Sequence, residues 1–228
     1  IKYNKKFEKA SWNEVYNIIK SKIDNTNKEQ ICGFVGDLTN METSFIFKEF
    51  FERTLEIKKY DSRTRNSFID ISSRENYLFN SKINGIEEAD LILLIGTNPR
   101  YEATMLNARI RKSFISNNLP IFSIGNPGDL TYHYKIVGNT TEDIKRFVNG
   151  ESEISSKIKK AKYPIVIIGE SALETKSGKY ILESIKNFLF KNNFINDTWN
   201  AFNVLTQNAS TVGAIDLNFF SIEEENNF

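Results

Sequence analysis

The sequence predicts an α/β fold, with a doubly wound, mostly parallel sheet and helices on both faces. Short apolar runs that each end at a glycine recur along the chain, and segments of helical periodicity separate them. Strands that are apolar on both sides belong to parallel sheets covered by helices, and their alternation with helices is typical of doubly wound folds. The expected strands are residues 91–95, 121–124 and 165–168, and the expected helices are 101–116, 141–160 and 179–192.

Two further helices and one strand are expected before residue 60. Ser11 with Glu14, and Thr39 with Glu42, have the spacing of capping boxes, in which the hydroxyl and the carboxylate bond each other's backbone amides. Apolar residues at helical spacing follow both pairs: Trp12, Val15, Tyr16, Ile19 and Ile23 after the first, and Phe47, Phe50, Phe51 and Leu55 after the second. Between the helices, residues 31–36 (ICGFVG) predict a buried strand.

Composition limits the classes of function. The 228 residues carry 30 basic and 29 acidic side chains, so no global field attracts nucleic acid. One cysteine cannot build a disulfide framework or an iron–sulfur cluster, and the central apolar run 91–95 is too short to cross a membrane. Because the chain opens at Ile1 in a polar stretch, we expect a fragment or a trimmed start. We expect residues 1–228 to form one α/β domain.

The segment 83–113 is the most informative. Asn98 and Pro99 suit a helix N-cap and first helical residue directly after the strand-ending Gly96. A helix N-terminus at the carboxyl end of a parallel strand is where α/β folds bind anions, so residues 96–99, including Thr97, are a candidate nucleotide-phosphate cradle. The spaced glycines of a dinucleotide fingerprint are missing, which favours an ordinary strand–turn–helix junction.

The helix that follows carries a cationic cluster. Leu106 and Ile110 are expected to face inward, and Asn107 to face outward or toward another element. The cations are Arg100, Arg109, Arg111 and Lys112. Because Glu102 is their only local counter-charge, we expect them to have partners beyond their own helix. Favourable interaction with the helix dipole would explain Arg111 and Lys112 near the C-terminal end of the helix, but not Arg100 at its N-terminal end.

The remaining candidates favour structural roles. Cys32 is expected to be a buried cysteine in a strand, and His133 a loop histidine that is packed or hydrogen-bonded between Tyr132 and Tyr134. Two groups of charged side chains offer carboxylates and bases: the pair Glu87 and Glu88, and the group Asp61, Arg63, Arg65 and Asp70. Paired carboxylates would allow glycosidase-type chemistry, but Glu87 and Glu88 are adjacent in sequence, point in different directions and are expected to form a solvated face. The sequence therefore predicts no catalytic, cofactor-binding or metal-ligating residue.

The stretch GIEEADLILLIGTNPRYEATMLNARIRK, residues 85–112, resembles the large iron–sulfur (75-kDa) subunit of respiratory complex I. The similarity is to that family's C-terminal region, whose fold is shared with molybdopterin oxidoreductases. Matching stretches occur in the same order at residues 73–80, 124–134, 164–173 and 198–217. The family's cluster-ligating cysteines lie in an N-terminal segment that this chain does not contain, and its domain extends beyond both ends of these residues.

The resemblance implies a non-catalytic structural and interaction module of the complex I peripheral arm, in an assembly that transfers electrons from NADH to ubiquinone. It implies no cofactor in this segment and iron–sulfur clusters elsewhere. The implied partners are other peripheral-arm subunits and the subunit's own iron–sulfur part, without nucleic acid or direct membrane insertion. The implied location is the matrix side of the mitochondrial inner membrane, or alternatively the cytoplasmic side of a bacterial plasma membrane.

Two alternatives remain open. A fragment of an active molybdopterin-dependent oxidoreductase would need a molybdenum-ligating residue and glycine-rich dinucleotide contacts, which the sequence does not display. A free-standing nucleotide-binding α/β module rests on analogy of fold alone.

Overall fold

The computed structural model describes residues 1–3, 6–36, 38–62 and 67–219. Its chain divides into two compact units, each with its own apolar core. Unit 1 comprises residues 1–63 and 213–228, and unit 2 comprises residues 64–212.

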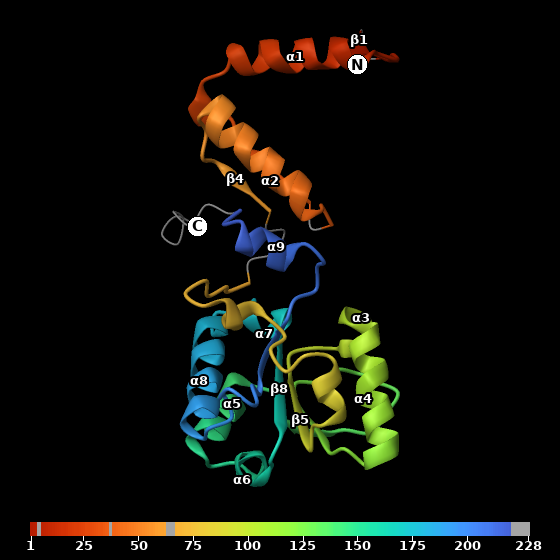
Figure 1. Ribbon diagram of the computed structural model, residues 1–228, viewed down its shortest axis with the longest axis vertical. Helices are drawn as coiled ribbons and strands as arrows, with labels where there is room; N and C mark the ends of the chain where they lie inside the picture. The colour runs from red at the N-terminus through yellow and green to blue at the C-terminus, as the bar shows by residue number, and fades with distance from the viewer. Residues whose placement is uncertain (4–5, 37, 63–66, 220–228) are drawn as a thin grey trace. The chain divides into compact units, whose positions relative to one another are not determined.

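The centre of unit 2 is a five-stranded, entirely parallel sheet in the order β7-β6-β5-β8-β9 (Figure 1). Strand order runs outward in one direction from β5 to β7 and in the other from β8 to β9, which is the doubly wound arrangement that the sequence predicts. Every residue of β5 and β8 is buried, as expected for central parallel strands. The strands are β5 (Leu91–Ile95), β6 (Ile121–Ile124), β7 (Lys135–Gly138), β8 (Pro164–Gly169) and β9 (Phe202–Leu205).

Helices cover both faces of this sheet. Figure 1 shows α5 and α8 on one side of β5 and β8, and α4 on the other. The expected helix 141–160 is two helices, because Gly150 ends the first in the left-handed region with φ +83°. No helix among the described residues is long and apolar enough to cross a membrane. The helices are α3 (Pro99–Glu102), α4 (Thr104–Asn117), α5 (Thr141–Asn149), α6 (Glu153–Lys160), α7 (Glu170–Leu173) and α8 (Gly178–Lys191), with 3₁₀ turns at Arg74–Tyr77 and Asn84–Glu87.

Residues 78–81 cover the outer edge of β9. The backbone amide of Val204 donates to the carbonyl of Leu78 over 3.0 Å. The amide of Ser81 donates to Oδ1 of the buried Asn203 over 2.8 Å. The first of these contacts satisfies a backbone amide of β9 that an uncovered edge strand would leave open to other chains.

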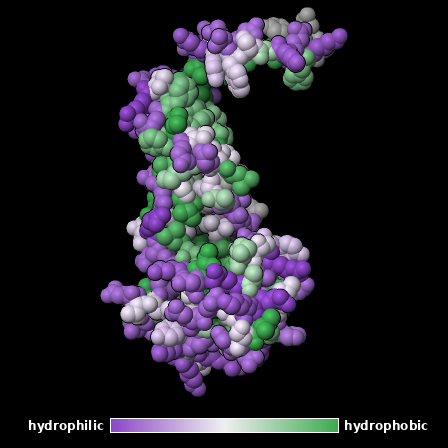
Figure 2. Space-filling view, turned by 45° about the vertical axis from the view of Figure 1, so that its right-hand side comes forward, coloured by the Kyte–Doolittle hydropathy of each residue, from purple (hydrophilic) through white to green (hydrophobic). Residues whose placement is uncertain are grey.

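Unit 1 has a small core made of Phe51, Ile57, Tyr60, Ala214 and Phe219. Two short antiparallel strands precede α1, and β3 pairs in parallel with β4. Many apolar side chains stay at the surface of this unit, as Figure 2 shows. Its elements are β1 (Lys2–Tyr3), β2 (Lys6–Phe7), α1 (Trp12–Asp24), a 3₁₀ turn (Lys28–Gln30), β3 (Gly33–Phe34), α2 (Met41–Glu49), a π-helical turn (Phe50–Leu55), β4 (Tyr60–Asp61) and α9 (Thr211–Asp216), which belongs to this unit from Gly213 onward.

The helix starts of unit 1 agree only in part with prediction. The capping box at Ser11 and Glu14 is confirmed. The predicted box at Thr39 is wrong, because α2 begins one residue later and Asn40 accepts the amide of Thr43 over 2.8 Å. Asparagine caps at least as well as threonine, so the later start keeps a strong cap. The apolar face predicted for α1 forms, but no residue of this helix is buried.

The strand expected at residues 31–36 is shorter and more exposed than predicted. Only Gly33 and Phe34 form β3, and the rings of Phe47 and Phe51 pack directly over Gly33. Cys32 is exposed, so the prediction of a buried cysteine is wrong. Successive strand residues face opposite sides, and here only the side of Gly33 packs against a core.

Candidate functional site

In doubly wound sheets, ligands bind where the strand order reverses, at the carboxyl ends of β5 and β8 in this fold. Here the two loops at that point pack against each other. A Cβ added to Gly96, whose φ is +55°, would lie 2.7 Å from the Cβ of Ala172, and one added to Gly169 would lie 2.3 Å from the carbonyl oxygen of Gly96. Ser171 also donates its hydroxyl to that carbonyl. The glycines are explained by this close approach of backbone to backbone.

The N-terminus of α3 is capped by the chain itself. Asn98 is the N-cap and accepts the amide of Arg100 over 3.0 Å, as predicted. The Glu102 carboxylate accepts the amide of Asn98 over 3.0 Å and the hydroxyl of Thr97. A carboxylate at a helix N-terminus takes the place that an anionic ligand would occupy. This internal pairing favours the junction interpretation of residues 96–99 over the phosphate cradle.

Three of the four clustered cations have acidic partners within unit 2. Arg109 lies 2.7 Å and Lys112 lies 3.2 Å from the same Glu87 carboxylate, and Arg100 pairs with Asp129. The expectation that Glu87 is merely solvated is therefore wrong. The 3₁₀ turn places this glutamate beside α4, whereas Glu88 is exposed and has no ion pair among the described residues.

The ion pairs shift the acidity of both carboxyl groups. The hydrogen bond and charge of Lys112, followed by those of Arg109, lower the pKa of Glu87 below its ordinary value. The backbone amide of Thr131 and then Arg100 lower the pKa of Asp129. Both carboxylates are accordingly charged at neutral pH and hold their cations in place.

The inner side of α4 is fixed by packing and by a buried amide. Leu106 and Ile110 are buried, as predicted. Asn107 accepts a hydrogen bond from the Tyr132 hydroxyl over 2.8 Å and donates to the carbonyl of Leu130 over 3.2 Å. Burial raises the pKa of Tyr132, which keeps its hydroxyl protonated as the donor. Asn107 thus faces the loop 125–134, one of the two orientations that the sequence predicts.

The outer side of α4 is different. The side chain of Arg111 is exposed and makes no ion pair or hydrogen bond with any residue that the structure describes. A surface groove of about 340 Å³ runs beside the helix. Its lining contains three cations, Arg100, Arg111 and Lys112, and no carboxylate among the described residues. This groove is the candidate interaction surface of unit 2.

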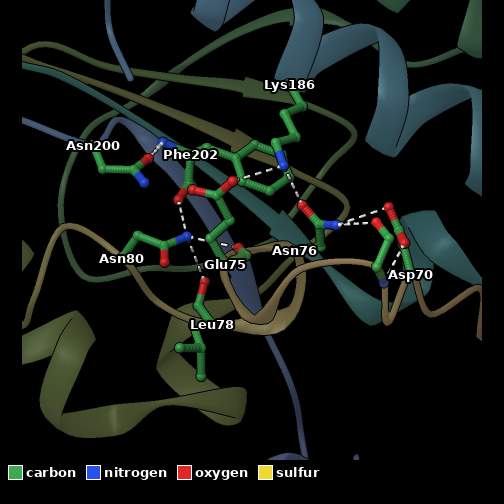
Figure 3. A network of polar contacts seen from close by, with 9 residues as sticks. Asp70, Glu75, Asn76, Leu78, Asn80, Lys186, Asn200 and Phe202 are labelled. Atoms are coloured by element: carbon green, nitrogen blue, oxygen red, sulfur yellow. Dashed lines mark hydrogen bonds and ion pairs between the residues drawn. The ribbon is translucent and has the colours of Figure 1, made fainter. Parts of the chain in front are cut away.

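A second polar cluster, shown in Figure 3, ties residues 70–80 to the sheet. Lys186 of α8 donates to Asn76 and, over 2.9 Å, to Glu75, and the buried Asn76 donates to Asp70 over 2.8 Å. The side-chain amide of Asn80 donates to the backbone carbonyl of Phe202 over 2.7 Å. These residues bond one another and the backbone, which gives the cluster a structural role rather than a catalytic one.

The other charged residues weighed from the sequence lie in different units or outside the described residues. Asp61 lies in β4 of unit 1 and Asp70 in unit 2, while Arg63 and Arg65 lie outside the described residues. His133 is exposed in its loop, with its ring 6.3 Å from that of Phe114. Within the described ranges, no group of three or more histidine, cysteine, aspartate or glutamate side chains could hold a metal ion.

Sequence reasoning missed two carboxylates that order the loops around β5. It treated Glu102 as a counter-charge for the arginines, whereas this side chain caps α3. It did not single out Asp90, which accepts the amides of Lys162 and Tyr163 over 2.6 and 2.9 Å. An acidic residue next to a turn is the only signal for either role, and such residues are common.

Comparison with known proteins agrees with the fold and with the resemblance expected from residues 85–112. The family model of molybdopterin oxidoreductase matches residues 1–227. An NADH-quinone oxidoreductase subunit of Rickettsia bellii is 35% identical over 219 residues, which cover 96% of this chain and 32% of the relative. The NADH-ubiquinone oxidoreductase 75 kDa subunit of Reclinomonas americana is 34% identical over 230 residues, covering 95% of this chain and 33% of the relative.

The chain thus spans about a third of the length of the curated relatives it matches. The matched family model, by contrast, extends across both units of the structure. The parallel sheet of unit 2, with helices on both faces, is consistent with this family. The chain belongs to the molybdopterin oxidoreductase family.

Proposed function

We propose that this chain is a structural and interaction module of respiratory complex I, within the peripheral arm of an assembly that transfers electrons from NADH to ubiquinone. The observation that carries the proposal is the identity of 34–35% over nearly the whole chain to subunits with those printed names. Because the chain matches only a third of their length, the redox activity belongs to the assembly and not to this segment alone.

The segment itself holds no cofactor and supplies no catalytic residue in this proposal. Two features support that assignment. The loops after β5 and β8 pack against each other where the strand order reverses, and Glu102 accepts hydrogen bonds from the amide and hydroxyl donors at the start of α3. The iron–sulfur clusters are then held by the remainder of the subunit and by other subunits.

The proposed partners are other peripheral-arm subunits and the iron–sulfur part of the same subunit, with no nucleic acid and no insertion into the bilayer. Residues 1–228 form one α/β domain within a larger molybdopterin oxidoreductase-like region, as the family match over residues 1–227 supports. We place the chain on the matrix side of the mitochondrial inner membrane, or on the cytoplasmic side of a bacterial plasma membrane.

The test is assembly together with metal content. The tagged chain, made in cells with the other subunits, should migrate on native gels in the band that oxidises NADH with a quinone acceptor. The chain purified by itself should contain neither iron nor molybdenum by elemental analysis. Stoichiometric molybdenum in that preparation would identify the chain as a fragment of an active molybdenum enzyme, and absence from the NADH-oxidising band would contradict membership of the complex.

A further inference from the structure

The groove beside α4 combines unbalanced positive charge with exposed apolar side chains. Four cations line or flank it, and only Glu87 and Asp129 pair with them among the described residues. Ile115, which lines the groove, is 62% exposed, and Met105, on the same helix but outside that lining, is 73% exposed. A surface with this composition is typical of the polar rim and apolar centre of a protein–protein interface.

The arrangement of the cations sets the chemistry of an occupant. Arg109 and Lys112 both pair with the carboxylate of Glu87, which keeps these two side chains engaged within unit 2. Arg111 is left as a guanidinium without a carboxylate, at a groove whose described lining offers none. Arginine pairs with carboxylates in a planar, bidentate geometry, and it is enriched where such pairs form between chains.

The shape of the groove favours a protein segment. Its wall along α4 includes the short side chains Thr104 and Ala108, between the longer Arg100 and Arg111. A volume of about 340 Å³ accommodates a few side chains rather than a large ligand. Nucleic acid, by contrast, selects broad basic faces, and this chain has a net charge of only +1.

We propose that this groove docks an acidic segment of another peripheral-arm subunit, which places a carboxylate against Arg111 and an apolar side chain against Met105, Ala108 or Ile115. This inference rests on the proposed function, since it names the surface and the partner chemistry that the module uses. Arg100, Arg109 and Lys112 stay with their internal partners, and Arg111 is the residue that selects the incoming segment.

The test is site-specific photo-crosslinking in the assembled complex. The photoreactive amino acid p-benzoylphenylalanine replaces Met105, and mass spectrometry identifies the crosslinked peptide. The expected peptide belongs to another subunit and carries net negative charge. The same amino acid in place of Phe190, which is 68% exposed on α8 of the same unit, is the control and should not capture that peptide.

Charge reversal then tests the role of Arg111. Arg111→Glu removes an attraction and adds a repulsion, each worth up to roughly fivefold for a partly exposed pair, so the crosslink yield should fall by more than about twofold and by up to roughly 25-fold. Arg146→Glu, the same change at an exposed arginine of α5, should alter the yield less than about twofold. A carboxylate-to-lysine change in the captured segment should restore the yield with Arg111→Glu.

The outcomes separate the two proposals. A wild-type chain that never enters the NADH-oxidising complex contradicts the proposed function. A chain that enters the complex, yet crosslinks through Met105 to a neutral or basic segment, to RNA or to lipid, overturns the docking inference alone. An undiminished yield with Arg111→Glu also overturns it, provided that thermal unfolding shows the variant to be folded.

Discussion

At the scale of single residues, carboxylates decide how the loops around the sheet are arranged. Glu102 caps α3, Glu87 joins a 3₁₀ turn to α4 through two cations, and Asp129 anchors Arg100. Each carboxylate accepts hydrogen bonds from donors of its own unit, and two of them, Glu87 and Asp129, also pair with cations there. The sequence displays these residues as ordinary surface acids, because their role depends on which loops the sheet brings together.

The carboxylate of Glu87, which pairs with two cations, makes the stability of unit 2 dependent on pH. The lowered pKa of Glu87 means that its pairing stabilises the folded chain above the ordinary value of 4.5, and that this contribution is lost as the pH falls through the lowered pKa. Glu87→Gln should therefore lower Tm at neutral pH. The difference in Tm from wild type should shrink as the pH falls below about 4.5, and it should disappear below the lowered pKa, where Glu87 is protonated and both chains are neutral at this position.

The neighbouring Glu88→Gln provides the matched control for this measurement. It makes the same chemical change one residue away, at an exposed side chain with no ion pair in the described part of the chain. Its Tm should stay close to that of wild type across the same pH range. A pH-independent loss of Tm in Glu87→Gln would show that packing, and not the ion pair, links the turn to α4.

At the scale of elements, periodicity predicted the central strands and most helices of unit 2 and missed the two edge strands of its sheet. The central strands β5, β6 and β8 and the helices α4, α5, α6 and α8 were predictable, because their apolar residues face the core of unit 2. The edge strand β7, with exposed or half-buried residues, and the short β9 gave no comparable pattern. Residues 31–36 misled because a short apolar run does not reveal whether one or both faces are buried.

The start of α2 provides a test of helix capping. Asn40 accepts the amide of Thr43, whereas the predicted cap Thr39 precedes the helix start by one more residue. Asn40→Ala should destabilise unit 1 by about 1 kcal/mol, the usual cost of losing a cap. Thr39→Ala should change the free energy of unfolding by less than about 0.5 kcal/mol. Urea denaturation followed by far-ultraviolet circular dichroism measures both, and the reverse ranking would restore the predicted capping box.

At the scale of the whole molecule, the two units differ in how the chain builds them. Unit 2 is one continuous segment with a large core around β5 and β8. Unit 1 joins both ends of the chain, since Phe51 and Tyr60 pack in the same core as Ala214 and Phe219. Tyr60 and Phe219 have their ring centroids 5.0 Å apart. No sequence pattern announces this pairing, because contacts between distant segments leave no local periodicity.

Folding of unit 2 should therefore precede and assist that of unit 1. Closing a flexible loop of residues 64–212 costs roughly 4 kcal/mol of chain entropy, and folding of that segment into unit 2 removes its flexibility and with it much of that cost. The core of unit 1 is small, and α1 adds no buried residue to it, so its apolar burial does not readily offset this entropy cost. If unit 1 folds only after unit 2 has folded, residues 1–228 act as one domain in the sense proposed above.

Fragments of the chain test this dependence. The excised segment 64–212 should unfold cooperatively, with a midpoint close to that given by Trp199 fluorescence in the full chain, because this tryptophan is buried in the core of unit 2. Residues 1–63 alone should show no cooperative transition, since they lack Ala214 and Phe219. Trp12→Phe makes Trp199 the sole tryptophan, because the chain contains two. A disordered 64–212 fragment would mean that the dependence between the units also runs in the opposite direction.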